Sequence, residues 1–385
     1  MQKGKDESVN SFLAEWFDPL PQLTKQQYLL KYFPGTNEAE MVELKSRRLF
    51  LKRSPCPDHL SSRDFHVGAK VILYGRDLFI VSYGDKATEA ALAPQTSKAF
   101  FLVGPEACSA MGNILDELLS STGGMLAKIK MFRLNPREAS AAATLLGSDG
   151  PGAQGDSTDL SGGATVAGVL QGADLGKALE RILGTGDMRR RSVWVVGEAD
   201  RVSQLVEHFW SDNKRDGLRS TATFDSCTCC VIKPHAVKEG HTGKIIDHIL
   251  TQVRPGHGAF FLGPALLTPE KRKGYEISAL ELFHLNRTEV AEFLDVYQGV
   301  IPEFSDAVDE MTTGPCLAME IRAQDPVTTF RQTAGPWDVD MAKELRPKSI
   351  RASFGVSNIR SGVHCTDLPE DGEPECRYFF ELMQP

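Results

Sequence analysis

Residues able to do chemistry concentrate in the stretch 355–367, where small and polar residues surround a single histidine, His364. A short apolar run ending in Lys233 lies far upstream, and Arg331 and Arg351 fall between the two stretches. Neutral imidazole is a nucleophile near physiological pH. Guanidinium groups clamp phosphate oxygens in bidentate fashion, and lysine adds a point charge. One histidine with three cations is therefore suited to handling a nucleotide phosphate.

Five spaced motifs run in order through the same part of the chain. They are IKPHAV with the later GKII, the pair Gly314-Pro315, RxxxG at 331–335, SIRASFG at 349–355 and VHCTD at 363–367. Together they resemble the nucleoside diphosphate kinases. The resemblance covers a C-terminal module, 226–385, and implies a ferredoxin-like α/β fold. In this module, 375–381 is expected to be the last strand.

The resemblance also implies roles for individual side chains. In that family a histidine takes the γ-phosphate of a nucleoside triphosphate and passes it to a diphosphate in a ping-pong cycle. By this comparison His364 is the nucleophile, and Glu375 bonds the imidazole and fixes its tautomer. The nucleotide-binding positions implied are Lys233, Arg331, Arg351 and Ser361. Mg²⁺ would enter with the nucleotide, and the resemblance implies no metal bound by the protein alone.

Two positions depart from the family pattern. Trp337 stands where the family has a threonine, and Ser361 stands where it has an asparagine. The bulky Trp337 is expected to block the phosphate site. Losing one phosphate hydrogen bond typically costs about 1–3 kcal/mol, so two losses would slow turnover by a few powers of ten without removing the histidine chemistry. Candidates for the aromatic that stacks on the base are Phe293, Leu294 and Tyr297.

The first ninety residues read as a small antiparallel β domain, because short alternating runs are separated by Gly, Pro and Asp. The motifs KYFPGTNEAEMVELKSRRLFLKRS and LFIVSYGD resemble the DM10 domain over residues 8–92. That family is β-rich, similar to pleckstrin-homology folds and found in proteins of cilia and flagella, which implies binding to the axonemal microtubule wall. The basic residues Lys45, Arg47, Arg48, Lys52 and Arg53 either meet the acidic surface of tubulin or keep an edge strand soluble.

The middle of the chain repeats the strand–helix–strand order of the C-terminal module, which indicates an internal duplication. The copy at 97–210 resembles a degenerate nucleoside diphosphate kinase module. Its Lys-Pro has become Gly104-Pro105, and Val196 is expected in the place of the histidine, so we predict no catalysis here. Residues 147–173, rich in Gly, Ser, Ala and Asp, are expected to form a loop.

Composition excludes several classes of protein. The 385 residues suit two or three domains. A net charge of −8 argues against nucleic-acid binding. The sequence contains no run of 18 apolar residues, so a membrane span is not expected. The start of the chain lacks the apolar region of a secretory signal. The cysteine cluster at 227, 229 and 230 lacks zinc spacing and is expected to fill a buried strand, in a reducing, cytoplasmic compartment.

The expected architecture is therefore α+β and multidomain: a β-rich, pleckstrin-homology-like DM10 domain followed by two ferredoxin-like kinase modules. It is similar to a class of nucleoside diphosphate kinase homologues associated with the cytoskeleton of cilia. One hypothesis is a structural protein inside axonemal doublet microtubules, with tubulin and neighbouring axonemal proteins as partners. The alternative is a working kinase that uses ATP and a nucleoside diphosphate through His364. The two modules would either assemble as hexamers, like the family, or pair within the chain.

Overall fold

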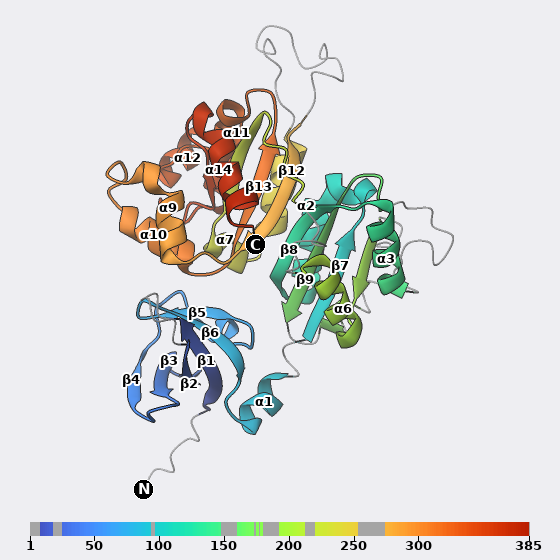
Figure 1. Cartoon of the computed structure of the whole chain (residues 1–385). Coiled ribbons are helices and arrows are strands. Elements are labelled where there is room, and N and C mark those ends of the chain that lie inside the picture. Colours follow the sequence, from blue (N-terminus) through green and yellow to red (C-terminus); the bar gives the residue numbers. More distant parts are fainter. Residues whose placement is uncertain are drawn as a thin grey trace.

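The computed structural model describes residues 8–17, 25–93, 97–147, 160–172, 175–176, 178–179, 192–211, 220–252 and 274–384. They form an N-terminal domain with a six-stranded sheet and two modules that share an eight-stranded sheet, as Figure 1 shows. None of the described helices is long and apolar enough to cross a membrane.

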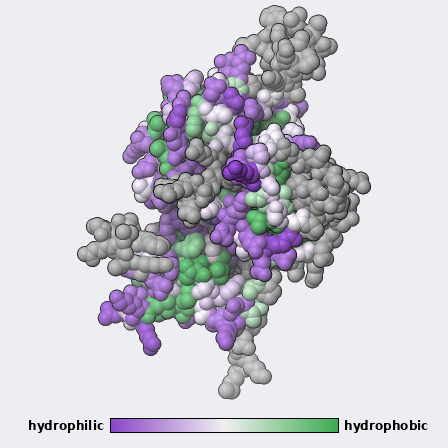
Figure 2. All heavy atoms as spheres, turned by 45° about the vertical axis from the view of Figure 1, so that its right-hand side comes forward, coloured by the Kyte–Doolittle hydropathy of each residue, from purple (hydrophilic) through white to green (hydrophobic). Residues whose placement is uncertain are grey.

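The N-terminal domain is an antiparallel sheet in the order β4-β3-β2-β1-β6-β5. Its strands are β1 Asn10–Phe17, β2 Lys25–Phe33, β3 Glu38–Glu43, β4 Leu49–Pro55, β5 Lys70–Leu73 and β6 Arg76–Tyr83, followed by helix α1 Lys86–Leu92. The strands lie where the alternation of apolar residues predicts them. Alternate side chains face one core, where the rings of Tyr32 and Phe65 stack with centroids 4.0 Å apart. Over this domain, Figure 2 shows hydrophobic residues bordered by hydrophilic ones.

The first module follows the N-terminal domain along the chain. Its elements are β7 Ser97–Val103, the 3₁₀ turn Pro105–Ala110, α2 Met111–Thr122, β8 Met125–Arg133, α3 Pro136–Leu146, β9 Ala164–Gly172, β10 Val193–Val196 and α6 Ala199–Phe209.

The second module begins with β11 Cys227–Ile232, α7 Pro234–Lys238, α8 Thr242–Thr251, β12 Glu276–Phe283, α9 Arg287–Phe293, α10 Phe304–Thr312 and β13 Cys316–Arg322. It continues with α11 Pro326–Ala334, α12 Val339–Leu345, α13 Ile350–Phe354, β14 Val363–Cys365, α14 Gly372–Arg377 and the π-helical turn Tyr378–Leu382. The prediction that the cysteines at 227, 229 and 230 lie in a buried strand is confirmed, because all three are buried in β11.

The two modules repeat one topology. The sheet order is β10-β7-β9-β8-β12-β13-β11-β14, and every neighbouring pair is antiparallel. Counted within each module, this is the order 4-1-3-2 followed by its reverse, 2-3-1-4. Each half is therefore a ferredoxin-like sheet, as the sequence predicts.

Strand β9 corrects part of the loop expected at 147–173. The run Ala164–Gly172 is almost wholly buried between β7 and β8. Gly168 must lack a side chain for the strand to pack, because a Cβ there would lie 2.2 Å from the Phe101 ring. Residues 148–159 and 173 of the expected loop lie outside the described part of the chain.

The modules pair with each other inside the chain, edge to edge through β8 and β12. Lys130 lies opposite Glu281 in this ladder, and their side chains form a largely buried ion pair of 2.9 Å. Lys130 Nζ also donates to the side-chain oxygen of Gln384 at 2.7 Å. Of the two arrangements that the sequence leaves open, the structure has the internal pair.

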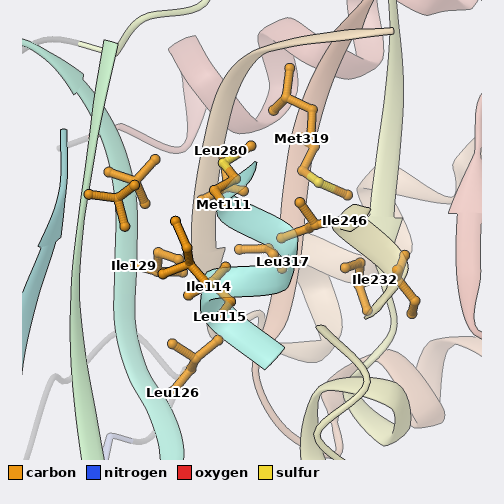
Figure 3. Close-up of a cluster of buried hydrophobic side chains, with 14 of the residues drawn as sticks. Met111, Ile114, Leu115, Leu126, Ile129, Ile232, Ile246, Leu280, Leu317 and Met319 are labelled. Atoms are coloured by element: carbon orange, nitrogen blue, oxygen red, sulfur yellow. The ribbon is translucent and has the colours of Figure 1, made fainter. Parts of the chain in front are cut away.

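Helices α2 and α8 cross on one face of this shared sheet, and their contact is nearly symmetric. A Cβ on Gly112 would lie 2.2 Å from the backbone nitrogen of Asp247, and one on Gly243 would lie 2.3 Å from that of Asp116. Each glycine thus lets the facing helix approach. One apolar core runs through both modules at this junction, as Figure 3 shows with residues such as Ile114 from α2 and neighbours from β12 and β13.

The N-terminal domain docks against both modules. Asp64 forms a 2.7 Å ion pair with Lys238 at the end of α7. Gln171 of β9 makes a 2.8 Å hydrogen bond to Nδ1 of His66, whose pKa is lowered by burial. A cleft of about 900 Å³ opens between this domain and the second module, and its lining includes none of the six predicted site residues.

Candidate functional site

His364 is the middle residue of β14, the last strand of the eight-stranded sheet. It pairs with Val231 of β11, and its side chain is 4% exposed. Its ring lies nearly perpendicular to two aromatic rings, Phe293 at 4.9 Å and Tyr297 at 5.8 Å between centroids. The sheet thus fixes the backbone of His364, and the aromatic rings fix the plane of its side chain.

Glu375 determines which nitrogen of His364 is available. Its Oε2 lies 2.9 Å from His364 Nε2 and accepts a second hydrogen bond, also 2.9 Å, from the Thr366 hydroxyl. A carboxylate can only accept, so Nε2 carries a hydrogen, and in the neutral ring Nδ1 then has the lone pair. This is the arrangement of a neutral nucleophilic imidazole oriented by a carboxylate. Thr366 was not singled out by the sequence, although it stands within the VHCTD motif.

The element that carries Glu375 corrects a prediction. The stretch 375–381 is not a strand, because α14 covers Gly372–Arg377 and a π-helical turn covers Tyr378–Leu382. Helical spacing puts Cys376, Phe379 and Phe380 together on the buried side, against the sheet face that β11 presents. Alternation and helical periodicity are hard to separate in seven residues, and the packing against β11 decides for the helix.

Lys233 is nearly completely buried just before α7. Its Nζ donates to the backbone oxygen of Ile359 at 2.8 Å and to the hydroxyl of Ser361 at 2.9 Å. Burial, together with the nearby Arg351 guanidinium, lowers the pKa of Lys233 to about 7. The structure therefore brings Lys233 and Ser361 together, but as donor and acceptor to each other.

Arg351, in α13, is buried as well and bonds to backbone. Its Nη1 donates to Gly335 O at 2.8 Å, and its Nε donates to Val363 O at 3.4 Å, next to His364. Arg331, in α11, is the exposed member of the set. Its Nε and Nη1 contact the side chain and the backbone oxygen of Asp367 at 3.3 and 3.0 Å. All three predicted phosphate-binding cations thus have protein acceptors.

Trp337 lies beside two of these cations. Its ring centroid is 5.3 Å from Lys233 Nζ and 5.6 Å from Arg351 Cζ, within the range of cation–π attraction. The indole thus lies next to two groups that the sequence predicts to bind phosphate, and its blocking of that site stays a prediction. Of the candidates for stacking on the base, Phe293 and Tyr297 pack on His364, and Leu294 is buried in the same cluster. Their contact with a base stays a prediction.

The pKa of the Tyr297 hydroxyl is affected by its buried position near His364. Burial and the nearby carboxyl groups of Glu375 and Asp367 raise the pKa of its hydroxyl. The phenol therefore stays protonated and cannot add a negative charge beside the imidazole.

A backbone hydrogen bond relates the two modules residue by residue. In the second module, Lys233 N–H donates to Gly362 O at 2.9 Å, and His364 follows two residues later. In the first module, the corresponding bond joins Gly104 N–H to Ser192 O at 2.8 Å.

The same count in the first module leads to Trp194, so the expectation that Val196 replaces the histidine is wrong. The strand ladders agree, because Trp194 pairs with Leu102 of β7 as His364 pairs with Val231 of β11. Trp194 is buried, and a Cβ on Gly104 would lie only 3.0 Å from its ring. The indole thus fills the space that a nucleophile and a lysine would need.

One buried cluster in the second module has the composition of a metal site. Donor atoms of Cys227, Glu320 and Cys376 lie within 4.8 Å of one another. The Glu320 carboxylate already accepts bonds from two backbone N–H groups and from the Ser278 hydroxyl. Burial raises the pKa of the neighbouring Cys229 thiol to about 11. These contacts favour protonated core thiols around a satisfied carboxylate.

Comparison with known proteins identifies the family. The family model of nucleoside diphosphate kinase matches residues 265–384. A rat protein, nucleoside diphosphate kinase homolog 7, is 33% identical over 97% of this chain and 93% of its own length. The chain belongs to the nucleoside diphosphate kinase homolog 7 family. The mouse homolog 7 is likewise 33% identical over the same shares of both chains.

Single-module kinases match only part of this chain. The nucleoside diphosphate kinase of Aquifex aeolicus is 28% identical over 41% of this chain and 95% of its own length. A crystal structure of that kinase covers 41% of this chain and 97% of its own, with a TM-score of 0.34 and 27% identity.

Proposed function

We propose that this chain is a structural protein of the ciliary or flagellar axoneme, seated inside the doublet microtubule against tubulin and neighbouring axonemal proteins. One observation carries the proposal: Lys233, Arg331 and Arg351 all have protein acceptors, and Trp337 lies beside two of them. A module whose phosphate-binding groups are engaged internally serves better as a building block than as a catalyst.

The rest of the chain supports the same role. Trp194 fills the equivalent space in the first module. The N-terminal domain, whose sequence resembles the DM10 domain, docks on both modules through Asp64 and His66. Three parts packed in this way form one body, which suits a component fixed in a lattice.

Extraction of isolated axonemes tests this proposal. The chain is expected in purified axonemes and is expected to stay with the doublets through mild-salt washes. A release by mild salt, or the absence of the chain from axonemes that beat normally, would contradict a position inside the doublet.

A second candidate function, phosphoryl transfer, is favoured by the geometry of His364, Glu375 and Thr366. Nδ1 would attack the γ-phosphorus of a nucleoside triphosphate that arrives with Mg²⁺, the N–P bond would form, and the bond to the diphosphate oxygen would break. A second diphosphate would then attack the phosphohistidine and leave as a triphosphate. Throughout, Nε2–H would stay bonded to Glu375, which stabilises the charge on the ring.

This reaction requires the site to open. Lys233 and Arg351 would exchange Ser361 and backbone acceptors for phosphate oxygens, and Trp337 would move away. The test is incubation of the full chain with γ-labelled ATP and Mg²⁺ beside His364→Ala. Acid-labile label on the wild type alone would establish the phosphohistidine. Absence of label from both would exclude this candidate and leave the structural role.

A further inference from the structure

We propose that His235, on helix α7, is a positioning residue for His364: it accepts a backbone hydrogen bond that fixes the turn leading into β14. The effect of His235 on phosphoryl transfer by His364 rests on the second candidate function. The hydrogen bond between His235 and the turn before β14 does not depend on that function or on a nucleotide. Figure 1 places α7 on the side of the second module that faces the N-terminal domain.

The contacts of His235 assign its tautomer. Gly362 N–H lies 3.2 Å from His235 Nε2, and a backbone N–H can only donate, so Nε2 accepts. The hydrogen of the neutral ring is then on Nδ1, which lies 2.9 Å from Oε1 of Glu310 and donates to it. The imidazole is 3% exposed, so water does not replace either partner readily.

Gly362 is the residue at which the chain turns into β14. It has a φ of +83°, a conformation that glycine adopts without strain. Its oxygen accepts from Lys233 N–H at 2.9 Å, and its N–H donates to His235. Both polar groups of Gly362 are therefore tied to the start of α7, two residues before His364.

Both ends of this arrangement are anchored. Glu310, which orients His235, also lies 3.9 Å from Nε of Arg360. At the other end of α7, Lys238 is held by Asp64 of the N-terminal domain at 2.7 Å. The five-residue helix thus lies between the docked domain and the turn before the nucleophile, and cannot shift without breaking one of these contacts.

The first module offers an internal comparison. Glu106 occupies the place of His235 there, and it contacts the hydroxyl of Ser192 at 3.5 Å rather than a backbone N–H. Trp194 stands two residues after Ser192, where the second module has His364. His235, which bonds to the turn, is thus present in the second module together with His364. In the first module both positions hold other residues, Glu106 and Trp194.

Hydrogen–deuterium exchange of the full chain tests this inference. The variants are His235→Ala, His235→Gln and His235→Asn, with His248→Ala on α8 as the control. Loss of one hydrogen bond is expected to speed exchange over residues 360–366 by roughly two- to twelve-fold. A glutamine amide can accept from Gly362 and donate to Glu310, so His235→Gln restores protection, whereas asparagine is one CH₂ too short.

Equal exchange over residues 360–366 in wild type and His235→Ala would overturn the proposal. If His235→Ala does not fold, the comparison of His235→Gln with His235→Asn decides, and equal exchange in these two would overturn it. Phosphoryl labelling of the same variants is the second readout. Where the wild type labels, label lost in His235→Ala and regained in His235→Gln supports positioning of His364, and equal label in all variants contradicts it. If no variant labels, only phosphoryl transfer fails, and exchange still decides the role of His235.

Discussion

Replacing Trp337 by threonine, the residue that the family pattern has there, is expected to open the phosphate site. The indole ring lies 5.3 Å from Lys233 Nζ and 5.6 Å from Arg351 Cζ. Each cation–π contact contributes about 0.5–2 kcal/mol, so removing both releases roughly 1–4 kcal/mol of attraction that competes with a nucleotide. That range corresponds to about 5-fold to several hundredfold more phosphohistidine at subsaturating ATP.

The assay is the rate of acid-labile labelling of the full chain by γ-labelled ATP and Mg²⁺. Trp337→Phe is the matched control, because it keeps an aromatic ring beside the cations and is expected to change labelling far less. His364→Ala, combined with Trp337→Thr, should abolish the label. If Trp337→Thr is as stable as wild type but is labelled no faster than Trp337→Phe, the indole does not block the site.

Three further predictions concern the stability of the fold. Gly243→Ala forces a Cβ to 2.3 Å from the facing backbone, and denaturation should show a loss of about 1–3 kcal/mol, whereas Gly35→Ala, with open space around it, should be near neutral. Because folding lowers the pKa of Lys233 to about 7, the unfolded chain binds more protons above that pH. Stability should therefore rise between pH 7 and the unfolded pKa of about 10.4, by at most about 1.4 kcal/mol per pH unit, and Lys233→Met should lack this rise in a pH series of unfolding curves. Glu375→Ala leaves two buried donors without their acceptor, and a urea titration should show a loss of about 1–3 kcal/mol in the free energy of unfolding. Glu373 is exposed, so Glu373→Ala should change that free energy by no more than about 0.5 kcal/mol. Equal losses in the two variants would contradict the role of the buried carboxylate.

Much of the fold was predictable because the signals were local. Near-alternation of apolar residues, with turn residues between the runs, located the six strands of the N-terminal domain, because most of them turn alternate side chains toward one core. The ordered motifs of the second module singled out Lys233 and Ser361, and in the structure a 2.9 Å hydrogen bond joins their side chains. The roles of these residues toward a nucleotide remain predictions.

The errors arose where packing between distant segments decides. The strand β9 lies in a stretch rich in Gly, Ser and Ala that is typical of a loop, but within it Gly168 leaves the space that the Phe101 ring needs. The sequence pattern predicts Val196 opposite the histidine, but the strand ladder places Trp194 there. Only the three-dimensional contacts reveal that the buried cations already have acceptors within the protein.

The structural role itself is tested most directly by electron cryo-microscopy of doublet microtubules from ciliated cells with and without this chain. We expect density inside the doublet that fits the three-part body, and loss of that density when the chain is removed. Doublets whose interior is unchanged without the chain would contradict the structural role.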